Sequence, residues 1–146
     1  MVVSRSGAEA LLERARARIA RWTPLEALRL VIDGALLVDI RPEIQRRQHG
    51  EVRWGVVIDR NVFEWRLDPG GPWSIPEATG PERTVVVLCQ EGYASSLAAA
   101  ALIELGYSRA GDVIGGFDAW RATGLPVQHA GSIPRASSER AVYNPR

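Results

Sequence analysis

The chain has 146 residues, of which 46% are apolar and 24% are charged, and its formal net charge is +1. This length suits a single domain with a substantial core, and the small net charge gives no reason to expect a nucleic-acid or membrane partner. Cys89 is the only cysteine and there are two histidines, so we expect no internal disulfide, no metal site and no cofactor. The chain also lacks a run of about 20 apolar residues, and we expect a cytoplasmic protein.

The N-terminal segment, residues 1–22, is predicted to be a helical extension. Apolar side chains fall on one side of an amphipathic helix over residues 8–22, and arginines fall on the other. Five arginines against two glutamates give the segment a local charge of +3, which is modest for a helix that binds membranes or nucleic acid. We therefore expect a helix with a solvated basic face, which packs on its own domain or mediates a homodimer.

Strand and helix patterns alternate over residues 23–127, which we take as one domain. Thr23, Pro24 and Glu26 form a helix start, with Thr23 as the cap and Glu26 completing a capping box. This order of elements is typical of a parallel sheet with helices on both faces. Residues 128–146, rich in Ser, Arg and Pro, are expected to form a surface or disordered tail. Strands are expected at residues 35–40, 56–58, 85–88 and 112–114, and helices at residues 23–31, 42–48, 62–67 (capped by Asn61), 95–105 and 117–122.

Cys89 stands where the strand at 85–88 ends and the helix at 95–105 approaches. Ligands of parallel sheets bind beyond the carboxyl ends of the strands. The sulfur would lie there beside N–H groups without an intrahelical partner and near the positive end of a helix dipole. Such a setting favours the thiolate, which is the nucleophilic form. From this context alone, an inert cysteine at a strand end is an equally good interpretation.

Four short motifs follow one another along the domain. They are Thr23-Pro24-Leu25-Glu26, Val38-Asp39-Ile40-Arg41, Val87-Leu88-Cys89-Gln90-Glu91-Gly92 and Gly115-Gly116-Phe117-Asp118-Ala119-Trp120. Their ordered set resembles the rhodanese (sulfurtransferase) domain over residues 23–127. The resemblance implies a three-layer α/β/α fold with a central parallel sheet of about five strands. It also implies that Cys89 accepts sulfane sulfur as a persulfide and passes it to a thiol or to cyanide.

The resemblance makes Cys89 the catalytic residue and surrounds it with an anion-binding loop. Successive N–H groups of a tight loop facing a helix N-terminus form a nest for an anion, which agrees with this role. Asp39 and Arg41 match the family's Asp-x-Arg, and we expect an ion pair or loop anchor behind the site. The implied partners are a sulfur donor, such as thiosulfate, mercaptopyruvate or a protein persulfide, and a thiol acceptor. The predicted loop residues are Gln90, Glu91, Gly92, Tyr93, Ala94 and Ser95.

The loop departs from the family pattern at two positions. Many active rhodaneses carry Cys-x-x-Gly-x-Arg; Ala94 stands in the place of that arginine, and Glu91 adds a negative charge. The loss of a guanidinium removes a bidentate anion clamp, which argues against efficient thiosulfate turnover. Arg60 and Arg66 follow a strand end and could reach the pocket instead, although solvated surface arginines are as good an interpretation.

The sequence favours a sulfurtransferase or persulfide carrier and leaves two alternatives open. One is a non-catalytic rhodanese-like binding module, and the other is a thiol redox sensor that uses Cys89. A phosphatase is disfavoured, because its Cys-x5-Arg loop would place an arginine at Ser95. Trp120 is expected in the core, and Tyr93 at the entrance to the pocket.

Overall fold

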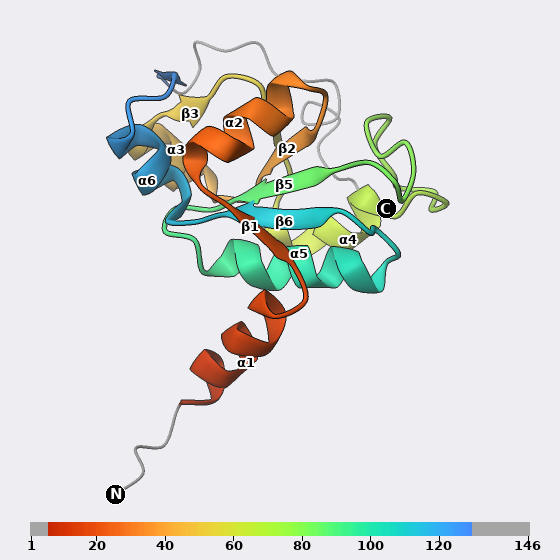
Figure 1. Cartoon of the computed structure of the whole chain (residues 1–146). Helices are drawn as coiled ribbons and strands as arrows, with labels where there is room; N and C mark the ends of the chain where they lie inside the picture. The colour runs from red at the N-terminus through yellow and green to blue at the C-terminus, as the bar shows by residue number, and fades with distance from the viewer. Residues whose placement is uncertain (1–5, 130–146) are drawn as a thin grey trace, which may run out of the picture.

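The computed structural model describes residues 6–129 (Figure 1). The main sheet has five strands in the order β1-β6-β5-β2-β4, and all its pairs are parallel. The predicted α/β fold with a central parallel sheet of this size is confirmed. The elements in chain order are α1 (Gly7–Arg16), β1 (Ala20–Trp22), α2 (Pro24–Ile32), β2 (Leu36–Asp39), α3 (Glu43–His49), β3 (Glu51–Val52), β4 (Val56–Val57), the 3-10 turn η1 (Arg60–Val62), α4 (Phe63–Leu67), β5 (Val85–Leu88), α5 (Ala94–Glu104), β6 (Ala110–Val113), α6 (Gly116–Ala122) and β7 (Val127–Gln128).

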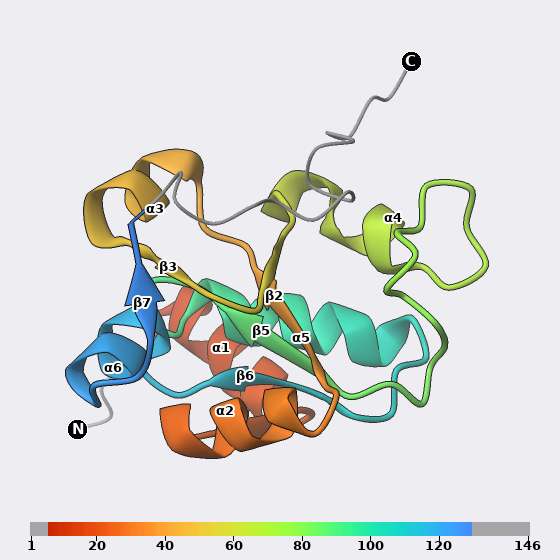
Figure 2. The same ribbon diagram turned by 90° about the horizontal axis from the view of Figure 1, so that it is seen from above.

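Helices cover both faces of this sheet, as Figures 1 and 2 show from two directions. Helix α5 lies on one face with α4 and α1 against it, and α2 and α6 lie together on the other. Successive residues of a strand point to opposite faces. Accordingly, Leu37 of β2 packs in the cluster that contains Trp120, whereas its neighbour Val38 packs in the cluster that contains Leu102. Strands buried on both faces are what a sheet between two helical layers requires.

The predicted helix over residues 8–22 is wrong at its C-terminal end. Helix α1 ends at Arg16, and Ala20–Trp22 forms edge strand β1, which pairs with Gly111–Val113 of β6. Gly111 permits this approach, because a Cβ at that position would collide with the carbonyl of Ala20. The helical periodicity could not reveal this ending, since the pairing partner of β1 lies about 90 residues further along the chain.

Smaller differences concern caps and short strands. The capping box of Thr23 and Glu26 at the start of α2 is confirmed. Asn61 is not a helix cap; instead its N–H donates to the Asp59 carboxylate at 2.7 Å, which begins the turn η1. Strands β3 and β7 pair with each other in an antiparallel fashion; neither was predicted, because neither has an apolar run such as the one at residues 56–58. The predicted tail begins within β7, and residues 130–146 lie outside the described residues.

The described helices are all too short or too polar to cross a lipid bilayer.

Candidate active site

Cys89 lies at the carboxyl end of β5, where it is 6% exposed and surrounded by the loop that leads to α5. The backbone N–H groups of Gly92 and Ser95 donate to its Sγ at 3.2 Å and 3.3 Å. The thiol itself donates to the hydroxyl oxygen of Ser95, with Sγ and Oγ 3.1 Å apart. Amide donors of this kind favour negative charge on the sulfur, so the local geometry suits a nucleophile.

The loop has further backbone N–H groups without a protein acceptor in the described part of the chain. Within residues 6–129, no acceptor pairs with the backbone N–H groups of Gln90, Glu91, Tyr93 and Ala94. Ala94 is also the first residue of the 11-residue helix α5, where the helix dipole adds positive potential. Unpaired N–H groups beside a sulfur can bind the outer atom of a persulfide or an anionic group of a sulfur donor.

Two glycines allow the cysteine loop to lie directly against the start of α6. Gly92 has a φ of +91°, and a Cβ there would lie 2.8 Å from the backbone nitrogen of Gly115. Gly116 has a φ of +61°, and a Cβ there would lie 2.5 Å from the carbonyl oxygen of Cys89. Any residue other than glycine would be strained by the left-handed conformation at these positions. Its Cβ would also collide with the neighbouring backbone.

The first turn of α6 bonds to the outside of the loop. The N–H of Phe117 donates to the carbonyl of Cys89 at 2.8 Å, and the N–H of Asp118 donates to the carbonyl of Gln90 at 3.0 Å. The side-chain amide of Gln90 also donates to the Asp118 carboxylate at 2.7 Å. The N-terminal N–H groups of a helix have no partner within the helix, and here the loop carbonyls accept from two of them.

Asp39 and Arg41 form the expected ion pair behind the loop. Both residues are buried, and the Arg41 Nη2 donates to Asp39 Oδ2 at 2.8 Å. The same guanidinium donates through Nη1 to the side-chain oxygen of Gln90 at 3.0 Å and lies 4.0 Å from the ring centroid of Phe117. Arg41 therefore connects the end of β2 to the cysteine loop and to α6.

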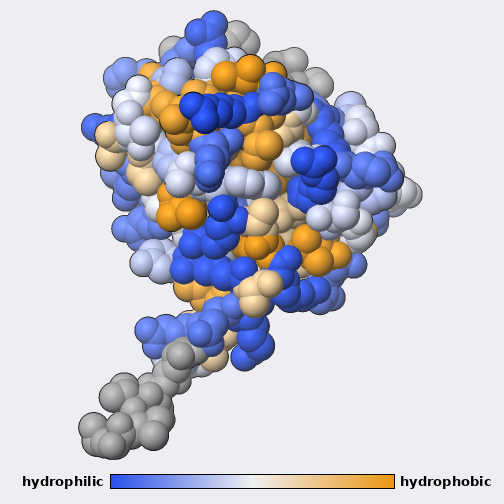
Figure 3. All heavy atoms as spheres, in the orientation of Figure 1, coloured by the Kyte–Doolittle hydropathy of each residue, from blue (hydrophilic) through white to orange (hydrophobic). Residues whose placement is uncertain are grey.

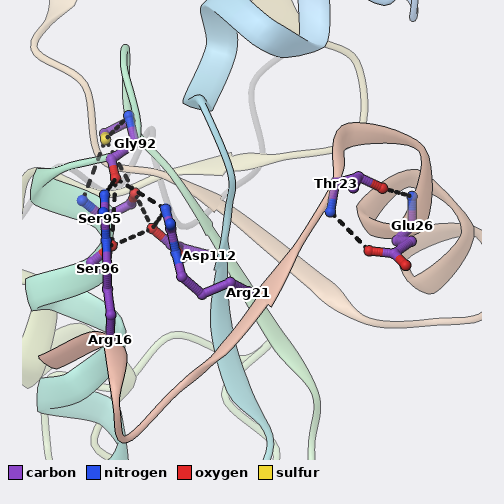
Figure 4. Close-up of polar contacts among 9 residues, drawn as sticks. Arg16, Arg21, Thr23, Glu26, Gly92, Ser95, Ser96 and Asp112 are labelled. Carbon is purple, nitrogen blue, oxygen red and sulfur yellow. Dashed lines mark hydrogen bonds and ion pairs between the residues drawn. The ribbon is translucent and has the colours of Figure 1, made fainter. Parts of the chain in front are cut away.

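Two arginines from the N-terminal segment reach the loop, and the sequence did not indicate them. Arg16 of α1 and Arg21 of β1 both donate to the carbonyl of Gly92, at 2.7 Å and 3.2 Å (Figure 4). The expectation of a solvated basic face is therefore wrong for these two arginines, although Arg18 forms an exposed pair with Glu104. Arg16 reaches the loop because α1 packs against α5, and Arg21 reaches it because β1 pairs with β6. No pattern in the sequence shows either contact.

Asp112 of β6 is a buried acidic residue of the site that sequence reasoning also missed. Its side chain is 0% exposed, and Oδ2 accepts hydrogen bonds from the hydroxyls of Ser95 and Ser96, both at 2.7 Å. Arg21 Nε donates to the other carboxylate oxygen at 2.9 Å, and Figure 4 shows these groups converging. Arg16 Nε in turn donates to the Ser96 hydroxyl at 3.0 Å. A buried carboxylate is tolerated only with such donors. The sequence signal that could have indicated Asp112 as a site residue was an aspartate within the strand next to β5, which precedes Cys89.

The remaining predicted residues lie around or away from the loop. Arg60 donates to Glu64 at 2.9 Å, and Arg66 donates to the carbonyl of Trp73 at 2.9 Å. Tyr93 is 58% exposed, and the guanidinium of Arg16 lies 5.5 Å from its ring centroid. Glu91 and Ala94 are exposed, whereas Trp120 is buried in the core as expected. Among residues 6–129, no cluster of three or more His, Cys, Asp or Glu side chains could hold a metal ion.

Comparison with known proteins identifies the family. The model of the rhodanese-like domain matches residues 23–123, and the chain therefore belongs to the rhodanese-like domain family. The thiosulfate sulfurtransferase GlpE of Haemophilus influenzae (strain PittEE) is 30% identical over 108 residues, which cover 74% of this chain and 93% of that protein. GlpE of Actinobacillus pleuropneumoniae is 43% identical over 49 residues, and this match spans only 45% of that relative's length and 34% of this chain.

Two solved structures have the same fold. A Rhodopseudomonas palustris protein of unknown function, described as a possible tyrosine phosphatase, superposes with a TM-score of 0.76 at 28% identity, covering 88% of this chain and 98% of that one. The polysulfide-sulfur transferase homodimer of Wolinella succinogenes superposes with a TM-score of 0.69 at 25% identity, covering 85% and 88%.

Proposed function

We propose that this protein is a sulfurtransferase that carries sulfane sulfur on Cys89 as a persulfide and passes it to a thiol or to cyanide. The observation that carries the proposal is the position of Sγ, which accepts two loop N–H groups while four further N–H groups of the loop have no acceptor in the described part of the chain. Membership of the rhodanese-like family, with thiosulfate sulfurtransferases among its relatives, supports it.

The transfer has two steps. The thiolate of Cys89 attacks the sulfane sulfur of the donor; a new S–S bond forms, and the donor's own bond to that sulfur breaks with its electron pair remaining on the leaving group, which is sulfite when the donor is thiosulfate. The outer sulfur of the persulfide then carries the negative charge, which the loop N–H groups stabilise. An acceptor thiolate or cyanide attacks this sulfur and restores the Cys89 thiolate.

The donor we propose is one that needs no arginine clamp. Ala94 stands at the loop position of the usual arginine, and Glu91 adds a negative charge. The nearest arginines, Arg16 and Arg21, donate to the Gly92 carbonyl. Mercaptopyruvate, a polysulfide or a protein persulfide therefore fits better than the thiosulfate dianion, whose recognition gains most from a bidentate guanidinium.

The phosphatase description of the Rhodopseudomonas palustris neighbour is not carried over to this chain. A cysteine phosphatase stabilises the transferring phosphoryl group with an arginine six residues after the nucleophile. Ser95 occupies that position here, and its hydroxyl donates to Asp112. A phosphoryl group would therefore lack its stabilising guanidinium, so sulfur transfer is the chemistry we propose.

Mass spectrometry of the intact protein and of its Cys89 peptide tests the proposal. After incubation with mercaptopyruvate, inorganic polysulfide or thiosulfate, we expect a mass increase of one sulfur atom on Cys89, with the smallest yield from thiosulfate. Cys89→Ser should show no increase. If no donor adds sulfur to the folded protein, the sulfurtransferase proposal fails and the alternatives of a binding module or a redox sensor take its place. Rapid formation of a sulfenic acid at Cys89 by peroxide would then favour the sensor.

We also propose that the protein acts in the cytoplasm and that α1 takes part in a homodimer. A single thiol without a disulfide partner suits a reducing compartment. Helix α1 projects from the body, and on the face shown in Figure 3 hydrophobic and hydrophilic residues are interspersed. Leu11 of α1 is 47% exposed. Cell fractionation tests the location, and sedimentation of the wild type against Leu11→Glu tests the dimer, which should dissociate in the variant.

A further inference from the structure

The buried carboxylate of Asp112 is connected to the thiol of Cys89 through one hydroxyl group. Ser95 donates its hydroxyl proton to Asp112 Oδ2 at 2.7 Å, and the thiol of Cys89 donates to the same hydroxyl oxygen at 3.1 Å. All three groups are nearly or fully buried, with exposures of 0% for Ser95 and Asp112 and 6% for Cys89. The chain Cys89–Ser95–Asp112 is therefore a continuous hydrogen-bonded path that is shielded from water.

The polarity of this path follows from counting protons. A serine hydroxyl has one proton to donate, and Ser95 gives it to Asp112, so it faces the sulfur with a lone pair. This arrangement fits a thiol and disfavours a thiolate, because Sγ without its proton would face an oxygen lone pair. Ser96 also gives its single proton to Asp112 while it accepts from Arg16, but it has no hydrogen bond to Sγ.

A shift of two protons reverses the polarity without breaking the path. If the thiol proton moves to Ser95 Oγ while the Ser95 proton moves to Asp112 Oδ2, the carboxyl becomes the donor and Ser95 donates to the sulfur. The thiolate then has three donors, namely the two backbone N–H groups at 3.2 Å and 3.3 Å and the Ser95 hydroxyl. The net charge of the buried site does not change, because the negative charge moves from Asp112 to Cys89.

We propose that Cys89, Ser95 and Asp112 form a proton relay that produces the thiolate, with Ser95 and Asp112 as positioning residues for sulfur transfer. The inference rests on the proposed function, since it assigns the origin of that reaction's nucleophile. A relay matters here because generating a new charge in a buried site is costly, whereas moving an existing one avoids most of that cost.

The proton also returns within one catalytic cycle. Asp112 holds it while Cys89 attacks the donor and while the persulfide anion persists. When cyanide or an acceptor thiolate removes the outer sulfur, the Cys89 thiolate is restored, and the proton passes back from Asp112 through Ser95 to Sγ. No proton is gained or lost over the cycle, and no further oxidant or reductant is needed.

Other charged groups surround the relay without joining it. Arg21 of β1 donates to Asp112 Oδ1 at 2.9 Å and to Oδ2 at 3.3 Å, and its hydrogen bond to Oδ1 remains when the carboxyl becomes neutral and the ion pair is lost. Arg16 of α1 contacts Ser96. On the loop itself, the side chains of Glu91 and Tyr93 are exposed.

Beyond the loop, Arg41 at the end of β2 and Asp118 of α6 both bond to the Gln90 side chain. Among the hydrogen bonds of Sγ within residues 6–129, only that to Ser95 Oγ leads on to a titratable side chain.

The pH profile of Cys89 alkylation by iodoacetamide, a neutral reagent, separates a relay from a structural role. Where the pair Cys89–Asp112 shares one proton, the thiolate fraction depends on the balance between two arrangements and not on the pH. We expect the wild-type rate to be nearly flat from about pH 5 to about pH 8. In Ser95→Ala and Asp112→Asn the thiol must lose its proton to solvent, and the rate should rise with pH over this range.

Ser96→Ala is the matched control, because it removes an equal hydrogen bond to Asp112 and leaves the path to Sγ intact. It should keep the flat profile. Ser95→Ala retains its backbone N–H donor to Sγ and serves if Asp112→Asn does not fold. A rate that rises with pH in the wild type, or a flat profile in Ser95→Ala, overturns the relay. Alkylation needs no sulfur donor, so failure of the relay is distinct from failure of persulfide formation, which the mass measurement reports.

Discussion

The contact between the cysteine loop and the start of α6 gives a prediction that can be worked out from the structure, namely the effect of Gly116→Ala. An alanine at this position must adopt a left-handed φ of +61°. Its Cβ would lie 2.5 Å from the carbonyl oxygen of Cys89. The conformation costs about 1–2 kcal/mol for a residue other than glycine. The carbonyl would have to move by about 1 Å to reach an ordinary contact distance, so its hydrogen bond from the N–H of Phe117 is weakened or lost.

The second bond between the loop and α6, from Asp118 to Gln90, would be disturbed with it. Each such bond contributes about 0.5–1.5 kcal/mol, and we therefore expect Gly116→Ala to lower the free energy of unfolding by about 2–5 kcal/mol. That is a large part of the total for a domain of this size, which is about 5–15 kcal/mol. The yield of Cys89 persulfide should also fall, since the loop donors move.

Gly124→Ala is the control for conformation alone. Gly124 has a φ of +87°, but a Cβ there would meet nothing within 4 Å. It should cost about 1–2 kcal/mol and leave the persulfide yield unchanged. Urea unfolding followed by tryptophan fluorescence measures both variants, with the midpoint changing and the slope staying constant. Equal midpoints for the two variants would refute the argument that the close approach of the loop is what requires glycine at position 116.

Four further predictions follow from the site and its surroundings. Arg16→Ala should lower the rate of persulfide formation severalfold, because the loop carbonyl loses a donor at 2.7 Å, whereas Arg14→Ala should leave the rate unchanged. Arg41→Ala should lower the free energy of unfolding by about 3–5 kcal/mol in denaturant titrations, because it leaves a buried carboxylate without its partner. Ala94→Arg should raise thiosulfate:cyanide turnover by supplying the missing clamp; unchanged turnover in a folded variant would mean that the pocket is shaped for another donor. Burial, followed by the charge of Asp68, raises the pKa of the Tyr107 hydroxyl above its ordinary value of 10.0. The folded state then holds this proton more tightly than the unfolded state does, so the free energy of unfolding should fall as the pH rises above about 10. Tyr107→Phe should remove that decline.

The elements that the sequence predicted well are those specified by local pattern. The strand ending at Leu88 is a continuous run of β-branched and apolar residues, the helix after the loop is rich in alanine, and the capping box at Thr23 is a local arrangement of side chains. Their order was enough to predict a parallel sheet with helices on both faces, although not its edge strand β1, because alternating strands and helices are typical of such sheets. Cys89 and its loop could be located for the same reason, since Cys89 lies between two such elements.

The residues that were missed depend on contacts between distant segments. Asp112 appears in the sequence as one aspartate in a short strand, and only the order of the sheet places it beside the helix that follows Cys89. Arg16 and Arg21 lie before the first of the family motifs, which begins at Thr23. Only the packing of α1 on α5 and the pairing of β1 with β6 bring them to the Gly92 carbonyl. Such contacts carry no periodic signal.

The hydrogen bonds that the carbonyl groups of the cysteine loop accept also determine where the backbone N–H groups of the loop point. In a planar trans peptide the C=O and N–H groups point in opposite directions, and none of the described peptides is cis. Helix α6 fixes the carbonyls of Cys89 and Gln90, and the two N-terminal arginines fix that of Gly92. The N–H groups of the residues that follow, Gln90, Glu91 and Tyr93, are thereby turned away from α6 and from the arginines. The direction of the loop's N–H donors can therefore be altered by changes in α1, β1 or α6, with every residue from Cys89 to Ser95 left as it is.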